Sequence, residues 1–341
     1  MKRTLTILAA TTALATPVFA EDLSVVGSWS SLPLHNEYEA PFWTEILPSA
    51  GDFNVELTTH NQMSLGLGDV YPLLGQGVYD VAMTVADYAV ADAPELEGLD
   101  VPLVAVTADE ARAMIDAARP MVSDIFRDRF NSHVLAIAPY PPQIVFCNHE
   151  ITSLDDLTGL KVRASGRMTA LLLEALGAEG VNVSFAEVPG ALQNGVVDCA
   201  VTGAGSGYSA GWWEVSTHLL PIPLGGWDPV VTAINLDKWN GMSAEDQTVL
   251  SEQIVTGFED PAWASAQGAL DNDIACLTGN GECASGEARS MTLVEVSDED
   301  FARARDILTT EVLPDWAERS GGDWATRWND SVGKVVGVTI E

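Results

Sequence analysis

ITSLDDLTGLKVRASGRMTALLLEALGAEGVNVSFAEVPGALQNGVVDCAVT, residues 151–202, is the most informative segment of this sequence. Three apolar runs alternate in it with two segments of helical character. The pattern predicts strands over 160–164, 181–185 and 196–201. It predicts helices over 168–176 and 189–194, and a glycine follows each of them as a helix terminator. This order of elements is typical of a β-α-β-α-β unit with parallel strands.

The carboxyl ends of these three strands are the first place to look for a binding site. Ligands of open parallel sheets bind beyond the carboxyl ends of the strands. Arg163, Phe185 and Thr202 each stand at such an end. We therefore expect all three side chains at a common ligand site.

Three motifs in the same stretch resemble the solute-binding proteins of TRAP (tripartite ATP-independent periplasmic) transporters, of the DctP type. They are S-L-D-D-L-x-G-L-K-V-R, then L-G-A, then F-x-E-V-x-x-A-L-Q-x-G-V-V-D, and a looser similarity runs from Leu23 to about Asp306. In that family the arginine after G-L-K-V forms a salt bridge with the substrate carboxylate. The resemblance assigns this role to Arg163. It also implies a receptor that carries an organic acid to a membrane permease.

The resemblance implies an α/β fold of the two-lobed periplasmic-binding-protein type. Each lobe would be a mostly parallel sheet flanked by helices, and crossover strands and a long bracing helix would join the lobes. We expect lobe I to comprise residues 21–140 and 229–268. Lobe II would comprise residues 141–228 and 269–341, the last part as a helical tail. The prolines in Pro139-Tyr140-Pro141-Pro142 stiffen the first crossover.

Residues 1–20 are typical of a secretory signal peptide. Lys2 and Arg3 precede an apolar run, and Val18-Phe19-Ala20 is a small-residue cleavage site. A buried N-terminal helix is the alternative. The signal predicts export, and the resemblance implies the periplasm as the location.

The formal net charge of −33 bears on possible partners. An acidic surface of this size repels nucleic acid and anionic lipid, so neither is expected as a partner. A buried arginine can still bind an anion, because dispersed surface charge is screened over about 8–10 Å at ordinary salt whereas the arginine acts at contact distance.

The four cysteines suit an exported protein. Cys276 and Cys283 bracket a turn-rich loop, and we expect a disulfide between them because the periplasm is oxidising. A metal site is the weaker alternative. Cys147 and Cys199 each lie in an apolar strand, where we expect buried, unreactive thiols.

Further ligand contacts are expected at other strand ends. Ser28 and Trp29 follow a strand that ends at residue 27, and Thr84 lies at the end of a strand over 79–85. Simple core packing is the alternative for Trp29. Trp227 lies near the second crossover and is a candidate wall of the pocket, again with a core position as the alternative.

Two departures from the family pattern concern the ligand. Many family members carry a second arginine where this chain has Gln143, an amide that hydrogen-bonds but cannot balance a second negative charge. Thr202 stands where the family has a ligand-binding asparagine. These residues favour a monocarboxylate, and the nearby aromatic residues favour an aromatic or apolar acid.

An exported enzyme on the same scaffold is the alternative function. Gly207-Tyr208-Ser209-Ala210-Gly211 matches the G-x-S-x-G element of hydrolases, but His218 is the only histidine after it and follows too closely for a triad. The histidines show no metal-ligand spacing, and no complete nucleotide loop is present. We therefore predict neither catalytic residues, nor a cofactor, nor a metal. A monomer and a dimer are both compatible with the sequence.

Overall fold

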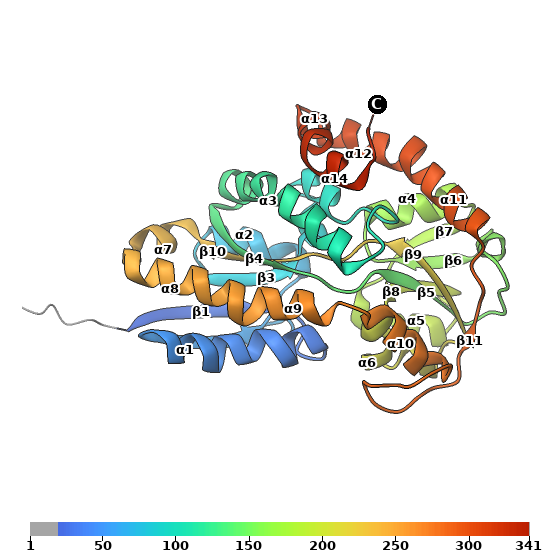
Figure 1. The fold of residues 1–341 in the computed structure, drawn as a ribbon, viewed down its shortest axis with the longest axis horizontal. Coiled ribbons are helices and arrows are strands. Elements are labelled where there is room, and N and C mark those ends of the chain that lie inside the picture. Colours follow the sequence, from blue (N-terminus) through green and yellow to red (C-terminus); the bar gives the residue numbers. More distant parts are fainter. Residues whose placement is uncertain (1–19, 341) are drawn as a thin grey trace, which may run out of the picture.

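The computed structural model describes residues 20–340, and its secondary structure forms two sheets side by side (Figure 1). The predicted signal peptide therefore lies outside the described residues, apart from Ala20. The first sheet has the strand order β2 (Phe53–Thr59), β1 (Glu21–Gly27), β3 (Val81–Val85), β10 (Val230–Asn235), β4 (Ser132–Ala138). The second has the order β11 (Thr292–Leu293), β9 (His218–Gly225), β5 (Gln143–Cys147), β8 (Cys199–Gly203), β6 (Lys161–Ala164), β7 (Glu179–Asn182).

Both sheets are mixed rather than wholly parallel. β1 is parallel to β2 and β3, but β10 is antiparallel to β3 and β4. In the second sheet β6 is parallel to β7 and β8, whereas β5 is antiparallel to β8 and β9. β5 and β10 are the strands that the chain forms directly after it crosses from one sheet to the other. The two-sheet architecture confirms the predicted fold class, while the domain boundaries stay a prediction.

Helices cover both faces of each sheet. On the first sheet, α2 (Val70–Gly75) and α3 (Ala108–Phe130) pack on one face against Val26 and Ala82. The helical segment that ends in α1 (Leu47–Ala50), together with α8 (Ala244–Ile254), packs on the other face against Val25 and Val81. Successive residues of a strand, such as Val25 and Val26, point to opposite faces of the sheet. Because both are apolar, the sheet can bury both of its faces.

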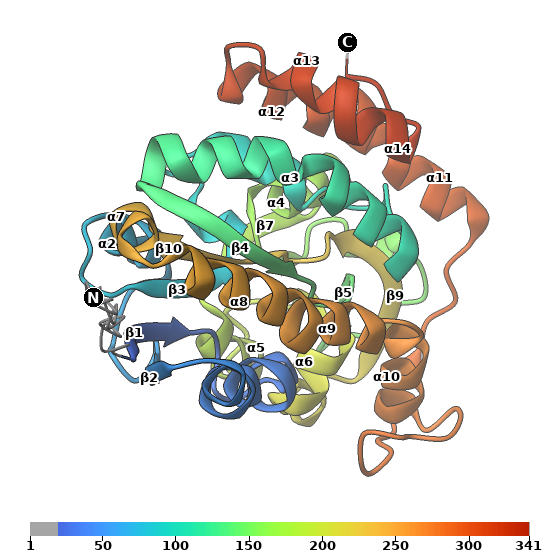
Figure 2. The same cartoon turned by 60° about the vertical axis from the view of Figure 1, so that its left-hand side comes forward.

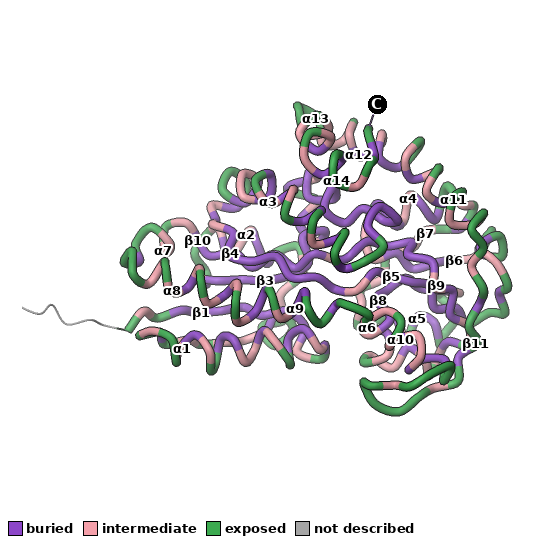
Figure 3. The backbone as a smooth tube through the Cα atoms, viewed as in Figure 1, coloured by how far each residue is buried: buried purple, intermediate pink, exposed green. Residues whose placement is uncertain are grey.

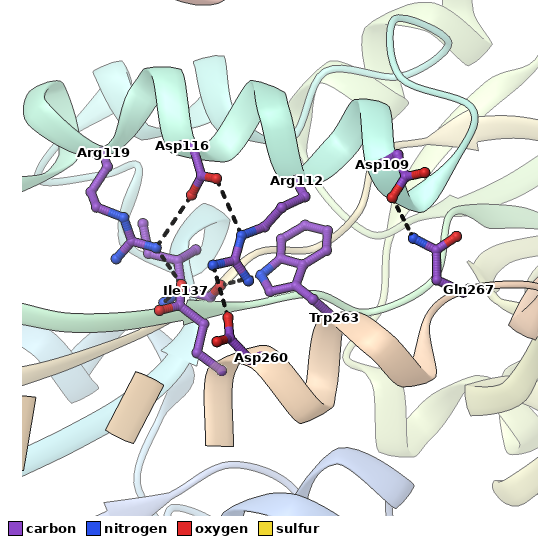
Figure 4. A network of polar contacts seen from close by, with 9 residues as sticks. Asp109, Arg112, Asp116, Arg119, Ile137, Asp260, Trp263 and Gln267 are labelled. Carbon is purple, nitrogen blue, oxygen red and sulfur yellow. Dashed lines mark hydrogen bonds and ion pairs between the residues drawn. The ribbon is translucent and has the colours of Figure 1, made fainter. Parts of the chain in front are cut away.

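Helix α3 is tied to the helix that crosses below it by a network of charged side chains (Figure 4). Arg112 reaches both Asp116 on its own helix and Asp260 at the start of α9 (Asp260–Ser265). Arg119 pairs with the buried Glu259, and Glu259 also accepts a hydrogen bond from the backbone N–H of Ile137 at 3.1 Å. The arginines of α3 therefore serve as partners of nearby acids.

The stretch that opened the sequence analysis folds as a parallel unit with β6 at its centre. The helices match the prediction within a residue or two: they are α4 (Arg167–Ala175) and α5 (Val188–Gln193). The second strand is earlier than expected and ends at Asn182, so Phe185 instead begins a short helical turn, Phe185–Glu187. The third strand is followed directly by α6 (Ala204–Ser209).

Both pairs of cysteines form disulfides. The predicted bond between Cys276 and Cys283 is confirmed. The expectation of free thiols at Cys147 and Cys199 is wrong, because these two residues also form a disulfide. Strands β5 and β8 are antiparallel neighbours, and their register places the two cysteines directly opposite each other with Cα atoms 4.0 Å apart.

The chain passes between the lobes in three places. Two of these crossovers, β4 to β5 and β9 to β10, are joined by a hydrogen bond from the N–H of Tyr140 to the carbonyl oxygen of Trp227 at 2.9 Å. The third follows a continuous helix over residues 244–265, which comprises α8, a helical turn and α9. This helix is separate from α10 (Ala269–Thr278), because Gly268, with a positive φ of 68°, lies between the two.

The C-terminal helices lie along one side of the molecule, next to α3 and α4 (Figure 2). Trp316 and Trp328 hydrogen-bond from their indole N–H to the carbonyl oxygens of Pro94 and Gly98 in lobe I. One continuous hydrophobic cluster joins both lobes and this tail, and the strands at its centre are buried (Figure 3). The remaining helices are α7 (Leu236–Gly241), α11 (Asp298–Ile307), α12 (Leu313–Ser320), α13 (Trp324–Trp328) and α14 (Lys334–Val336). Within residues 20–340, every helix is too short or too polar to span a bilayer.

Candidate functional site

A small cavity lies between the two sheets, with walls from both lobes and from both crossovers. Its volume is about 20 Å³, far below the roughly 300–1,000 Å³ of open ligand pockets, so its walls lie close together in this structure. The side chains that line it are Trp29, Leu32, Val85, Tyr88, Tyr140, Arg163, Phe185, Thr202, Ser206 and Asp228. Arg163 is the only basic residue among them, all of which belong to the described part of the chain.

Arg163 projects from β6 and is 2% exposed. Its Nε donates to the carbonyl oxygen of Val183 at 2.9 Å, and its Nη1 donates to that of Val201 at 2.7 Å. A guanidinium carries five N–H donors, so these two bonds fix its plane and leave donors for a ligand. Among residues 20–340, no carboxylate pairs directly with it. Burial lowers the pKa of this guanidinium, although Tyr88 and Asp228 raise it, and an arginine remains charged throughout.

Aromatic rings form most of the remaining wall. The ring centroid of Trp29 lies 5.7 Å from that of Tyr88 and 6.2 Å from that of Tyr140. On the lobe II side, Phe185 packs 5.4 Å from the buried ring of Trp212. Rings from both lobes therefore face the same small volume, as a site for a flat or apolar ligand requires.

An acidic group faces Arg163 from the second crossover. Asp228 lines the cavity and remains partly accessible through it, although protein atoms surround most of the side chain. Burial raises the pKa of Asp228 to about 7. The positive charge of Arg163 lowers this pKa, and the charge of Asp87 raises it. Burial also holds the pKa values of Asp87 and Asp100 well above their usual range. These carboxyls therefore retain protons at pH values where ordinary aspartates are ionised.

Four of the eight predicted ligand residues line this cavity together: Arg163, Phe185, Thr202 and Trp29. Ser28 and Thr84 do not line it. The hydroxyl of Ser28 donates to the buried Glu39 at 2.5 Å. Thr84 is fully buried on the opposite face of β3 from Val85, because neighbouring residues of a strand point to opposite faces.

Gln143 and Trp227 also stand apart from the cavity wall. The indole N–H of Trp227 donates to the carbonyl oxygen of Ala105 at 2.8 Å, and its ring packs beside Trp263 in the joint hydrophobic cluster. Gln143 is fully buried, and its amide lies near enough to the Asp228 carboxyl to lower the pKa of that group. Gln143 thus lies behind Asp228 rather than in the cavity wall, and ligand contact by any of the eight residues stays a prediction.

Val85 lies at the strand end where the sequence places Thr84, and the sequence reasoning missed five other lining residues: Leu32, Tyr88, Tyr140, Ser206 and Asp228. A signal was available for Tyr88, since it lies in the helical turn directly beyond the carboxyl end of β3. Tyr140 and Asp228 belong to the two crossovers, which any two-lobed fold places beside the interlobe site. Nothing in the local sequence marks Leu32 or Ser206.

A wider groove lies beside this cavity and shares Tyr140 and Ser206 with it. Its lining contains carboxylates such as Glu37 and Asp273 but no lysine, arginine or histidine. An organic anion therefore finds no positive charge there. Ser209 of the G-x-S-x-G element is exposed in this groove, and its hydroxyl has no hydrogen bond to a histidine in the described part of the chain. Over residues 20–340, no three of the potential metal ligands His, Cys, Asp and Glu are grouped to hold an ion.

Comparison with known proteins gives relatives at low identity. Residues 41–260 match the DctP family model, described as bacterial extracellular solute-binding protein, family 7. The ectoine-binding periplasmic protein TeaA of Halomonas elongata is 26% identical over 170 residues, which are 49% of this chain and 47% of TeaA. The C4-dicarboxylate-binding periplasmic protein DctP of Rhodobacter capsulatus is 28% identical over 182 residues, which are 53% of this chain and 51% of the relative. The chain thus spans about half the length of the curated relatives it matches.

Solved structures share the fold over nearly the whole chain. An extracytoplasmic solute receptor of Bordetella pertussis that binds pyroglutamic acid, DctP7, gives a TM-score of 0.79 at 20% identity, covering 92% of this chain and 99% of that chain. A TRAP periplasmic solute binding protein of Desulfovibrio salexigens with bound orotic acid gives 0.80 at 14% identity, covering 93% and 99%. Since the family match spans well over half of the chain and the two-lobed fold agrees with it, the protein belongs to the DctP family of bacterial extracellular solute-binding proteins, as the motifs around Arg163 predicted.

Proposed function

We propose that this protein is the periplasmic receptor of a TRAP transporter and that it binds one small organic acid between its lobes for delivery to a membrane permease. The observation that carries the proposal is the state of Arg163. Its guanidinium is buried, fixed by two backbone carbonyl groups and free of a direct carboxylate partner in the described structure. A ligand carboxylate supplies that partner through charge-assisted, bidentate hydrogen bonds.

The ligand class follows from the charge of the cavity and from its aromatic walls. One basic side chain balances one carboxylate, and Gln143 adds no second positive charge. The relatives with solved or named ligands bind pyroglutamic acid, orotic acid, ectoine and C4-dicarboxylates. We place this protein with those that take a single carboxylate on a small ring, since the rings of Trp29, Tyr88 and Phe185 offer flat apolar walls.

The experiment is a thermal-shift screen of small carboxylic acids, followed by isothermal titration calorimetry of each acid that raises the melting temperature. Arg163→Ala should weaken binding by about 100-fold or more, because truncating a buried hydrogen-bonded charge pair costs about 2–5 kcal/mol. The variant should still fold, since it loses two hydrogen bonds worth about 1 kcal/mol each. Arg163→Lys should retain part of the affinity.

Arg127→Ala is the matched control, because that arginine is exposed and pairs with exposed Asp124 and Asp128. Its affinity should equal that of the parent protein. Unchanged binding by Arg163→Ala would refute the assignment. The enzyme alternative makes a different prediction, namely that the bound acid is converted. Mass spectrometry of the released ligand checks this, and a receptor returns the acid unchanged.

A further inference from the structure

Asp228 occupies a position in the cavity that a receptor for simple anions does not need. It lies on the second crossover and lines the same cavity as Arg163, without a direct ion pair between the two side chains in the described structure. Its backbone N–H donates to Oδ1 of Asp100 at 2.7 Å, so a neighbouring carboxyl holds the residue in place. The cavity therefore presents one positive and one negative group to the same small occupant.

The groups behind Asp228 leave its charge without a permanent partner. Asp87 and Asp100 are buried acids themselves, at 8% and 3% exposure, so neither supplies a positive charge to Asp228. The nearby Glu97 is already matched by Arg319, through two hydrogen bonds of 2.7 and 2.5 Å. Gln143 and Tyr88 are neutral, which leaves Arg163 as the remaining positive group facing Asp228. When a ligand carboxylate engages Arg163, the Asp228 carboxylate loses that compensation.

The aromatic walls favour a particular kind of counter-charge. Trp29, Tyr88, Tyr140 and Phe185 all line the cavity. Cations are attracted to ring faces, most of all cations that shed water easily, such as alkylated or delocalised nitrogen groups. A compact, strongly hydrated ammonium gains less in such surroundings because desolvation costs it more.

We propose that Asp228 is a second ligand-binding residue and that the site takes a small zwitterion, with its carboxylate on Arg163 and an alkylated or delocalised nitrogen cation between Asp228 and the aromatic rings. This inference rests on the proposed function and narrows it. A zwitterion satisfies both charged groups of the cavity and leaves its net charge unchanged. A plain monocarboxylate satisfies only one of them, and it adds negative charge beside three buried acids.

The test compares three ligands that share a five-membered ring and a carboxylate: cyclopentanecarboxylate, proline and N,N-dimethylproline. They place a CH₂ group, a secondary ammonium and a quaternary ammonium at the equivalent ring position. Calorimetry at pH 8 should give the tightest binding for N,N-dimethylproline, at least about tenfold tighter than for cyclopentanecarboxylate. Proline should fall between them.

Asp228→Asn is the decisive variant. The φ of Asp228 is +40°, a region that asparagine adopts more readily than other non-glycine residues, so the amide should replace the carboxyl without backbone strain. The preference for the cationic ligand should shrink to about threefold or less, and cyclopentanecarboxylate should bind at least as tightly as before. Asp273→Asn is the control. Burial raises the pKa of Asp273 too, to about 6, but this residue lines the wider groove and not the cavity. The preference for the cationic ligand should therefore persist in Asp273→Asn.

The outcomes separate this inference from the proposed function. Equal or tighter binding of cyclopentanecarboxylate by the parent protein would overturn the role of Asp228, and so would an unchanged preference in Asp228→Asn. Failure of all three ligands to bind at millimolar concentration would overturn the zwitterion class. The receptor function itself fails only if the affinity for every acid is independent of Arg163.

Discussion

Arg163 and Arg319 both bring a guanidinium against the interior, but their surroundings differ. Arg319 on α12 faces Glu97 through two hydrogen bonds and Asp315 through a third at 2.7 Å, so its charge is matched within the protein. Arg163 has only the carbonyl oxygens of Val183 and Val201. Glu97 and Arg319 hold the C-terminal tail on lobe I, whereas Arg163 has no opposite charge paired with it in the described structure. A buried charge whose partners are dipoles rather than opposite charges is a candidate binding group, and this difference underlies the role proposed for Arg163.

Removal of Arg319 should have the largest effect on stability. Arg319→Ala leaves the Glu97 side chain, which is 1% exposed, as an unpaired buried carboxylate. We expect the free energy of unfolding to fall by about 3–5 kcal/mol. Ligand affinity should change less than tenfold, the reverse of the pattern expected for Arg163→Ala.

Urea denaturation and calorimetry on the same preparation check this prediction. The double variant Glu97→Gln, Arg319→Met removes both charges and should regain part of the lost stability. If Arg319→Ala lost no more stability than Arg163→Ala, the proposed difference between a structural Arg319 and a ligand-binding Arg163 would be contradicted.

The pH dependence of stability should come from the site rather than from the tail. Burial raises the pKa of Asp228 to about 7, and those of Asp87 and Asp100 are also raised. Between about pH 4 and pH 7 the unfolded chain releases protons that the folded chain keeps, so stability falls as pH rises through this window. Each unit of pKa difference between the folded and unfolded states is worth about 1.4 kcal/mol, so Asp228 alone should make the change measurable.

The melting temperature of the ligand-free protein should therefore rise as pH is lowered from 8 to 5. Backbone hydrogen bonds lower the pKa values of Glu110 and Asp156, and these groups cost stability only below about pH 4. Asp228→Asn should reduce the slope between pH 5 and 8. A melting temperature that is flat or rises with pH across this range would contradict the assignment.

Arg127→Ala should have the smallest effect. Its side chain is 52% exposed and its partners on α3 are exposed as well. Ion pairs between exposed side chains contribute little to stability, so the free energy of unfolding should equal that of the parent protein within the error of the measurement. A larger loss, measured by the same urea denaturation, would show that ion pairing in general, rather than burial of a matched pair, stabilises this protein.

Local signals in the sequence were enough to predict most of the elements and the central residue of the site. In the helix Ala108–Phe130, for example, Thr107 and Glu110 form a capping box at the start, and Asn131 takes a left-handed conformation after the last turn. Arg163 was identified through its position at a strand end and through the family motif. Both kinds of information lie within a few residues of the position they describe.

Features that depend on strand pairing and side-chain direction could not be predicted in the same way. The disulfide between Cys147 and Cys199 joins residues 52 positions apart, and only the antiparallel register of β5 and β8 brings them together. Thr84 and Val85 differ by one position, but only Val85 lines the cavity. The place of Asp228 in the cavity wall depends on the course of the crossover and on a positive φ that few non-glycine residues adopt.

The hydrogen bond between Tyr140 and Trp227 has a mechanical consequence. It joins the two crossover strands at the point where the lobes would pivot, and Tyr140 and the neighbouring Asp228 both line the cavity. Points close to a pivot travel least when two rigid bodies swing apart. A ligand arriving at the open receptor would therefore meet Tyr140 and Asp228 already in their final positions, while Trp29 and Arg163 swing in on longer lever arms to complete the enclosure.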